Sequence, residues 1–190
     1  MNVPYGFGSL DRTAFHLINA AWTHPVLDRV MPAITDANQN KWVVFGAAPA
    51  AIAFWLYKGR RRALKVLIIA ALACGACDLL AFRVIKPAVH RLRPNYAGIG
   101  AIVRASEGGK FGFPSNHATN ASAAASVLTV AYPAFGIVFW SVAGLIAYSR
   151  VYCGVHYPFD VLAGLALGLL AWPWAALMLG SGDGVKKKKR

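Results

Sequence analysis

Three short segments carry most of the side chains in this 190-residue chain that could do chemistry. The first runs from Lys86 to Pro94, the second is Pro114-Ser115-Asn116-His117, and the third contains Ser149-Arg150, His156 and Asp160. Together they supply cations, two histidines, a serine and a carboxylate at the ends of apolar runs. Charge beside hydrocarbon is costly unless it is paired or functional. An anionic substrate accounts for this set, so we expect a phosphate-binding, phosphate-transferring site at a membrane surface.

The pair His156 and Asp160 is the predicted catalytic centre. The two residues are four apart at the start of an apolar run, so a helix places them on one face, where the carboxylate can accept a hydrogen bond from one ring nitrogen. The other nitrogen is then free and basic. Such a histidine can attack phosphorus and form a phosphohistidine that water hydrolyses. The same spacing could hold a metal, but the chain has only seven acidic residues and no carboxylate cluster.

His117 is the natural general acid, because its predicted position at a helix N-terminus places it beside a bound anion. The hydroxyl of Ser115 and the backbone N–H groups of Asn116 and His117 can donate to phosphate oxygens, as helix starts do for anions. The second segment is therefore predicted to hold phosphate and to protonate the leaving group.

Three cations are predicted to neutralise the charge on the transferring group: Lys86, Arg93 and Arg150. The alternative for each is contact with lipid headgroups or snorkelling at a helix end. In other phosphoryl-transfer sites magnesium supplies this positive charge, so we expect neither a metal nor another cofactor.

The three segments resemble the signature of the type 2 phosphatidic acid phosphatase superfamily, written KxxxxxxRP, PSGH and SRxxxxxHxxxD. Lys86 with Arg93-Pro94 fits the first motif, Pro114 to His117 the second, and Ser149 to Asp160 the third, in the same order and with the same internal spacings. The resemblance implies that His156 is the nucleophile and His117 the acid. Asn116 stands where the family pattern has Gly. Asn tolerates unusual backbone angles better than most residues, so we expect a similar loop with altered substrate contacts.

The elements that must position these motifs are predicted to be membrane helices. The chain is 57% hydrophobic and 14% charged, with mean hydropathy +0.48, and its apolar blocks are long enough to cross a bilayer. We predict one all-α domain over residues 1–190, an integral membrane bundle of about five helices. The predicted crossings are 42–57, 63–85, 117–132, 134–148 and 157–179.

The two ends of the chain are predicted to differ from the bundle 42–179. Residues 9–35 have apolar side chains at helical spacing among charged ones, which indicates amphipathic helices lying in the membrane interface; a plain surface helix fits equally. Residues 180–190 are predicted to be a basic cytoplasmic tail. Within the bundle, small residues in the third helix and Gly164 and Gly168 in the fifth predict close helix packing, with the third helix inside.

Basic residues set the predicted orientation. With five crossings, the clusters at 58–65 and 186–190 fall on one side, which should be the cytoplasm, and all three motifs fall on the other. The protein is thus predicted to be a multi-pass protein of a bacterial inner membrane, with its site facing the periplasm or the exterior. The net charge of +13 could suggest nucleic acid, but five of these charges are the Lys186–Arg190 tail, so no nucleic-acid partner is expected.

Some remaining polar residues have two interpretations. Asp78 lies inside the second predicted crossing, where an acid is either functional or hydrogen-bonded to a neighbouring helix, and the structural role is favoured. His90 and Arg91 lie within the first motif without belonging to its pattern, and could contact a second phosphate or a sugar. Cys74 and Cys77 are predicted to be packing residues.

The predicted function is metal-independent hydrolysis of a lipid phosphate or diphosphate monoester through a phosphohistidine. Undecaprenyl diphosphate is the first choice of substrate; the alternatives that the resemblance implies are lipid A 1-phosphate and phosphatidylglycerol phosphate. The expected partners are this substrate and membrane lipids, while the sequence does not give an oligomeric state. Other classes also fit: a lipid phosphotransferase, a non-catalytic lipid-phosphate binder, or a vanadate-dependent halide oxidase, against which the apolar spans argue.

Overall fold

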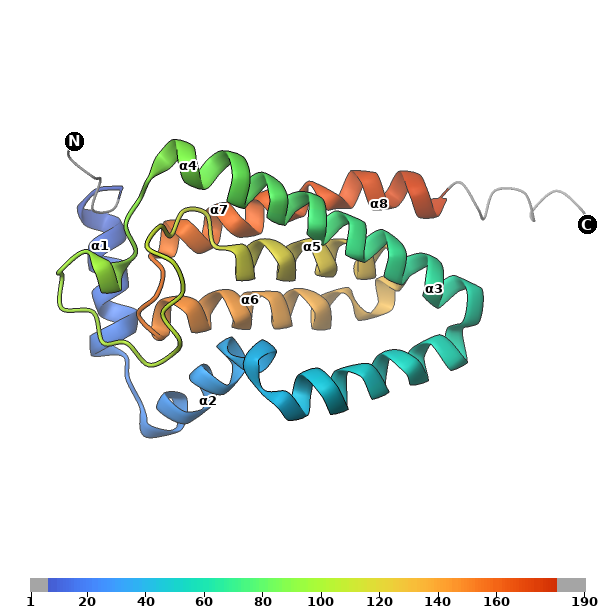
Figure 1. The fold of residues 1–190 in the computed structure, drawn as a ribbon, viewed down its shortest axis with the longest axis horizontal. Coiled ribbons are helices and arrows are strands. Elements are labelled where there is room, and N and C mark those ends of the chain that lie inside the picture. Colours follow the sequence, from blue (N-terminus) through green and yellow to red (C-terminus); the bar gives the residue numbers. More distant parts are fainter. Residues whose placement is uncertain (1–6, 181–190) are drawn as a thin grey trace, which may run out of the picture.

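The computed structural model describes residues 7–180, which form an all-helical bundle, as predicted (Figure 1). No β-strand occurs within these residues. The helices, in chain order, are α1 (Ser9–His16), α2 (Pro25–Thr35), α3 (Ala48–Leu80), α4 (Lys86–Val89), α5 (Asn116–Ala131), α6 (Gly136–Tyr152), α7 (Pro158–Leu169) and α8 (Ala171–Gly180). The predicted basic tail beyond Gly180 lies outside the described residues.

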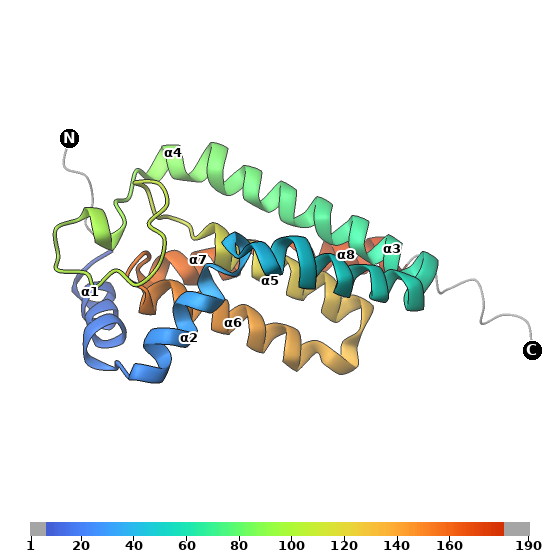
Figure 2. The ribbon, with the colours of Figure 1, turned by 60° about the horizontal axis from the view of Figure 1, so that its bottom comes forward.

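Helix α3 belongs to one long helical segment, Val43–Val89, that folds back on itself at Arg60. Arg60 has φ 47° and ψ −127°, and a Cβ on Gly59 would lie 2.6 Å from the Cβ of Ala63, so the bend needs a glycine beside it. The first arm (residues 43–59) and the second arm (residues 61–89) form a hairpin whose bend lies at the end of the molecule opposite α1 (Figure 1, Figure 2). The arms match the first two predicted crossings.

Within residues 7–180, three segments are long and apolar enough to cross a membrane: Val43–Val89, Pro133–Tyr152 and Pro158–Gly180. Helix α5 is not among them because it has only 16 residues, about 24 Å at the helical rise, between the second motif and Pro133. The membrane character is therefore supported, while the count of five crossings stays a prediction.

Helix α5 lies at the centre of the bundle and packs against α3, α6, α7 and α8, as its small residues predicted. Its closest neighbour is α7. A Cβ on Gly164 would lie 2.6 Å from the carbonyl oxygen of Ser115, and one on Gly168 would lie 2.3 Å from that of Thr119. The predicted glycine stripe is thus a backbone contact, and it fixes the second motif, at the start of α5, against the third motif, at the start of α7.

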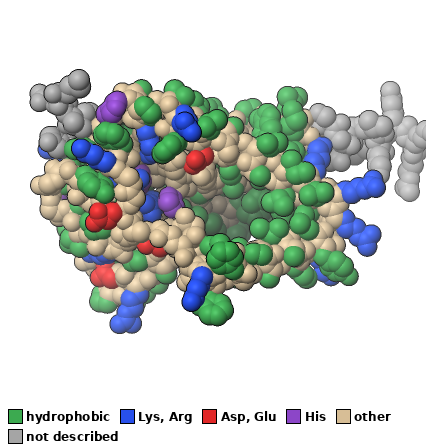
Figure 3. Space-filling model, in the orientation of Figure 1, with side chains coloured by type: hydrophobic (Ala, Val, Ile, Leu, Met, Phe, Trp, Pro, Cys, Tyr) green, Lys and Arg blue, Asp and Glu red, His purple; other side chains and the backbone are tan. Residues whose placement is uncertain are grey.

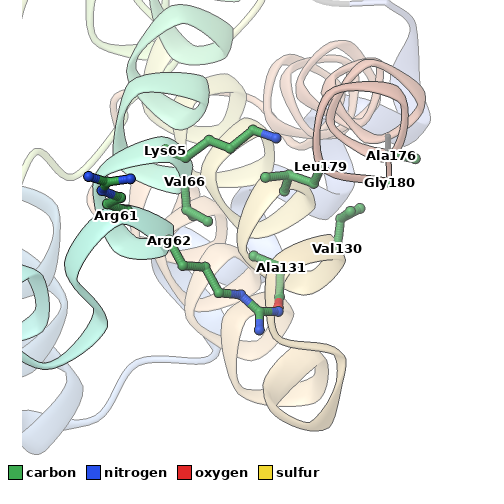
Figure 4. A pocket seen from close by; sticks show the side chains of 9 residues that line it. All are labelled: Arg61, Arg62, Lys65, Val66, Val130, Ala131, Ala176, Leu179 and Gly180. Carbon is green, nitrogen blue, oxygen red and sulfur yellow. The ribbon is translucent and has the colours of Figure 1, made fainter. Parts of the chain in front are cut away.

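All three motifs converge on one end of the bundle, as predicted. We call it the motif end; it is formed by the end of α4, the starts of α5 and α7, and the end of α6 (Figure 1). At the opposite end a cavity of about 570 Å³ lies between the second arm, α5 and α8. Figure 4 shows three cationic side chains at this cavity, those of Arg61, Arg62 and Lys65. Arg62 donates to the carbonyl oxygen of Ala131 at 2.8 Å.

The N-terminal helices α1 and α2 are packed on the motif end. Phe15 of α1 is buried against Tyr157 and Val151, and Met31 of α2 against Tyr152. The buried amide of Asn19 donates to the carbonyl oxygens of Ile102 and Tyr152, both at 2.8 Å. These contacts tie the N-terminal segment to the bundle and to the 90–115 loop. Whether the two helices also lie in the membrane interface stays a prediction.

Replacing Gly168 by Ala should lower stability, because the new Cβ would meet the backbone of α5, which can yield only by separating the helices. Overpacking of this kind costs about 1–3 kcal/mol. The measurement is the thermal midpoint of unfolding in detergent. Gly144→Ala in α6 is the control, since nothing lies within 4 Å of a Cβ there. Equal midpoints for the two variants would contradict the close α5–α7 contact.

Candidate active site

His156 lies between a carboxylate and a guanidinium, and these two neighbours define its tautomer. Its Nδ1 is 3.2 Å from Oδ2 of Asp160, and its Nε2 is 2.8 Å from Nη1 of Arg93. A guanidinium can only donate, so Nε2 must be the acceptor and Nδ1 must carry the proton, which it donates to Asp160. The predicted pairing of His156 with Asp160 is therefore present, and Nε2 holds the lone pair that a nucleophile needs.

Burial keeps this imidazole neutral. The side chain of His156 is 1% exposed, and the pKa of its ring lies well below its ordinary value, first because of desolvation and then because of the positive charges of Arg93, Arg150 and Lys86. A protonated ring would be one more cation in a cationic site. At neutral pH the lone pair on Nε2 is consequently available.

Asp160 forms a buried ion pair with Arg91, which forms a second one with Asp11. Oδ1 of Asp160 accepts from Arg91, whose guanidinium also donates to Asp11 of α1, and all three side chains are fully buried. Asp11 in turn accepts the backbone N–H of Phe159 at 3.0 Å. Arg91 also stacks on Tyr157, 4.2 Å from the ring centroid. The suggestion that Arg91 contacts a phosphate or sugar is wrong, because its guanidinium is enclosed between two carboxylates.

Arg91 and Arg93 reach the same centre because the chain around them is extended. Leu92 pairs with Phe111 in a short antiparallel bridge, with hydrogen bonds from the Arg93 N–H to the Lys110 oxygen at 3.1 Å and from the Gly112 N–H to the Arg91 oxygen at 2.8 Å. Alternate residues of an extended segment point to one face. The two arginines therefore point together toward Asp160 and His156.

The predicted phosphate-binding residues Ser115, Lys86 and Arg150 lie around His156. The Ser115 hydroxyl is fully buried and has no hydrogen-bond partner in the described structure, so its donor is available to a ligand. Lys86 donates to the carbonyl oxygen of Pro114 at 2.6 Å, and Arg150 donates to the Thr35 hydroxyl at 2.6 Å. Arg150 also has a buried Nε without a partner. Donors in excess of local acceptors are what an oxyanion requires.

His117 and Asn116 lie where two cavities adjoin. One cavity, about 700 Å³, is lined by these two residues, by His90 and by four cationic side chains of the first motif and its surroundings: Arg83, Lys86, Arg93 and Lys110. We call it the cationic cavity. The other, about 490 Å³, is lined by His117, Asn116 and Asp78 among others. His117 is thus placed to exchange a proton with a group bound in either cavity.

Two features of the site were not found from the sequence. The Asp11–Arg91 pair joins residues 80 positions apart, and no local pattern links them. Gly112 allows the loop to approach the centre: a Cβ there would lie 2.9 Å from Oδ2 of Asp160 and 3.0 Å from Cγ of Arg93. In the sequence, the only indication of this close approach is a single glycine two residues before the second motif.

Asn116, which stands where the family pattern has Gly, forms a side-chain hydrogen bond that a glycine could not form. Its side-chain amide donates to Oδ1 of Asp78 at 2.7 Å, and Asn120, one turn further along α5, donates to the same oxygen at 3.0 Å. The favoured structural role of Asp78, a hydrogen bond to a neighbouring helix, is confirmed. The carboxylate also lines a cavity, which that interpretation did not include.

Comparison with known proteins identifies the family of the chain. Residues 64–181 match the family model described as the PAP2 superfamily. The chain is 31% identical to the lipid A 4'-phosphatase of Porphyromonas gingivalis over 85% of this chain and 69% of that protein.

Two solved structures share the fold. The transmembrane PAP2-type phosphatidylglycerolphosphate phosphatase of Bacillus subtilis has a TM-score of 0.63 at 27% identity, over 96% of this chain and 91% of that one. Aquifex aeolicus LpxE has a TM-score of 0.70 at 24% identity, over 90% and 97%.

Arg91→Met should destabilise the protein strongly, because it leaves Asp11 and Asp160 buried without their cation. Removing one member of a buried ion pair costs about 3–5 kcal/mol. The readout is the midpoint of unfolding in detergent. Arg83→Met, at an exposed position, is the control and should change the midpoint little. A midpoint for Arg91→Met within a degree of wild type would disprove the proposed charge compensation.

The ring of His156 should be neutral and protonated on Nδ1 at pH 7.5, and it should still be neutral at pH 6.5, because its pKa lies well below this ordinary value. Nitrogen-15 NMR of histidine-labelled protein in detergent distinguishes the two tautomers and the cation. His156→Ala assigns the signal, and the exposed His16 is an internal reference. A His156 signal that titrates near pH 6.5 would refute the assignment of a neutral ring.

Proposed function

The chain belongs to the PAP2 superfamily, and we propose that it releases phosphate from a membrane lipid through a phosphohistidine formed on His156. The family match confirms the resemblance carried by the three motifs, and its relatives are phosphatases of lipids, so the chain is a lipid phosphatase. One observation carries the proposed mechanism: His156 has its proton fixed on Nδ1 by Asp160 and its Nε2 lone pair turned toward Arg93.

The reaction is proposed to have two balanced steps. In the first, Nε2 of His156 attacks phosphorus, the bond between phosphorus and the leaving oxygen breaks, and His117 gives that oxygen a proton. In the second, water attacks the phosphohistidine, His117 takes the water's proton, and the P–N bond breaks to release inorganic phosphate and neutral His156. Asp160 accepts the Nδ1–H hydrogen bond throughout and stabilises the charge that the ring acquires.

Substrate binding would itself free the nucleophile. Arg93 donates to the neutral Nε2 at 2.8 Å, but a phosphate oxygen is an anionic and therefore stronger acceptor. The pKa of Arg93 is lowered, mainly by desolvation, so a nearby anion is energetically favourable. Together with Lys86, Arg150 and the unpaired Ser115 hydroxyl, Arg93 is proposed to hold the transferring group, with the backbone N–H groups of Asn116 and His117.

The membrane arrangement is proposed in the form predicted from the sequence. Residues 42–179 would form the membrane part of a single domain with about five crossings, and α1 and α2 would cover the motif end. The site would face away from the cytoplasm of a bacterial inner membrane, since the exposed cations Arg61, Arg62 and Lys65 lie at the other end of the bundle.

The relatives do not agree on one substrate. The Porphyromonas gingivalis relative is named for lipid A and the Bacillus subtilis structure for phosphatidylglycerolphosphate. Undecaprenyl diphosphate, the first choice from the sequence, and lipid A 1-phosphate stay predictions beside these. The shared chemistry is a terminal phosphate on a membrane lipid, held either as a monoester or as the outer phosphate of a diphosphate, and this is the substrate class that we propose.

Phosphate release by the purified protein in detergent should persist in EDTA, because the cations of the site supply the positive charge that a metal supplies elsewhere. It should fall at least about a thousandfold in His156→Ala. Lipid A, phosphatidylglycerol phosphate, phosphatidic acid and undecaprenyl diphosphate are compared, with folding of the variant checked by its unfolding midpoint.

A labelled phosphoryl group trapped on wild type and absent from His156→Ala would support the intermediate directly. Transfer of that group to a second lipid instead of water would identify a phosphotransferase. No release from any lipid by folded wild type would sink the phosphatase proposal.

A further inference from the structure

Asp78 carries a negative charge that the described structure does not neutralise. It lies in the second arm of α3, where a carboxylate beside hydrocarbon is costly. Its Oδ1 accepts from Asn116 and Asn120, but both donors are neutral amides, and no ion pair to Asp78 forms within residues 7–180. Two amides at one oxygen position the carboxylate and leave Oδ2 without a hydrogen-bond donor from the described residues.

The residues of this cluster line a cavity. Asp78, Asn116, His117 and Asn120 line the cavity of about 490 Å³, which we call the Asp78 cavity, and Ile34 and Ile146 are among the residues that enclose it. Oδ1 of Asn120 is buried and also lacks a partner. The space-filling view shows this face hollowed between the two arms of α3, with charged and histidine side chains at the end nearer α1 and hydrophobic ones around the hollow (Figure 3).

The two cavities that meet at His117 differ in charge. The cationic cavity holds Lys86 and Arg93 and suits the phosphate group. The Asp78 cavity does not, because a phosphate oxygen about 4 Å from the carboxylate would be repelled by about 4 kcal/mol at an effective dielectric constant of 20. Its two unpaired acceptors suit a hydrogen-bond donor that is neutral or positive, such as a hydroxyl, an amide N–H or an ammonium group.

The leaving group is the part of the substrate that reaches this cavity. His117, the proposed acid, must lie within hydrogen-bond distance of the leaving oxygen, and it lines both cavities. If Lys86 and Arg93 of the cationic cavity hold the phosphate, with Arg93 in contact with His156, the atoms beyond the leaving oxygen can extend past His117 toward Asp78 and Asn120.

We propose that Asp78, Asn116 and Asn120 form a subsite that recognises a hydroxyl or N–H group of the leaving alcohol, next to the phosphate ester. This rests on the proposed function and narrows its substrate class. Phosphate esters of a sugar or of glycerol with a free hydroxyl offer such a donor. A polyprenyl diphosphate is disfavoured, because its leaving group is itself a phosphate and would meet the Asp78 carboxylate. Asn116, where the family pattern has Gly, supplies one of the two hydrogen bonds that hold Asp78.

The test compares kcat/KM on three lipids in detergent. The leaving alcohol of phosphatidylglycerol phosphate has a free hydroxyl, that of phosphatidic acid has none, and undecaprenyl diphosphate releases a phosphate. Wild type should favour the first by at least about tenfold, the scale of one hydrogen bond to a charged group. In Asp78→Asn, kcat/KM should fall on phosphatidylglycerol phosphate and stay unchanged on phosphatidic acid, so that the preference is lost. On undecaprenyl diphosphate kcat/KM should rise, because the carboxylate no longer repels the leaving phosphate.

Two further variants make the test decisive. Asn120→Ala, which removes the unpaired acceptor and keeps Asp78, should also lower kcat/KM selectively on phosphatidylglycerol phosphate, so the proposal stays testable if Asp78→Asn does not fold. Cys77→Ala, next to Asp78 on the same helix, is the control and should leave all three values unchanged. Wild type without the preference, or variants that lose activity equally on every lipid, would overturn the subsite alone. Wild type inactive on all three would overturn the proposed function and the subsite with it.

Discussion

The buried carboxylate of Asp160 has to be compensated, and the rest of the motif end is arranged around that requirement. A carboxylate away from water is tolerated only when it is paired and hydrogen-bonded. Asp160 accepts hydrogen bonds from Arg91, His156 and the Tyr157 backbone. Arg91 also forms an ion pair with Asp11 in α1, so one guanidinium compensates two carboxylates. Asp11 and Asp160 both accept N–H groups at the start of α7, where the helix dipole favours negative charge. His156, the 90–115 loop and the N-terminal helix are therefore joined by one network of charges and hydrogen bonds.

Backbone contacts between helices fix the distances between the motifs more narrowly than ionic contacts do. The glycines of α7 let its backbone touch that of α5, so the distance between the second and third motifs is set by hard contact. The first motif reaches the centre through the Leu92–Phe111 bridge and the space left at Gly112. Ionic contacts alone would tolerate shifts that these backbone contacts forbid.

The sequence predicted what depends on local spacing. His156 and Asp160 share a helix face because they are four apart, and the motifs meet at one end because helix ends alternate along the chain. The break between the first two predicted crossings coincides with the bend at Arg60. The Asp11–Arg91 pair could not be predicted, because only the fold brings α1 to the first motif. Counting apolar spans did not identify helix α5, because most of its 16 residues are small or polar and the helix is packed inside the bundle, where membrane length does not select its composition.

The shortness of α5 has a consequence for the depth of the site. Its axis of about 24 Å is several ångströms less than the roughly 30 Å hydrocarbon core of a typical bilayer. No residue of α5 is exposed, because α3, α6, α7 and α8 surround it, so the difference in length does not by itself bring hydrocarbon to the polar start Ser115–His117. In the membrane arrangement proposed above, the surrounding helices therefore set the fit to the bilayer, and a short central helix lets the site lie below the level of the headgroups, inside the protein.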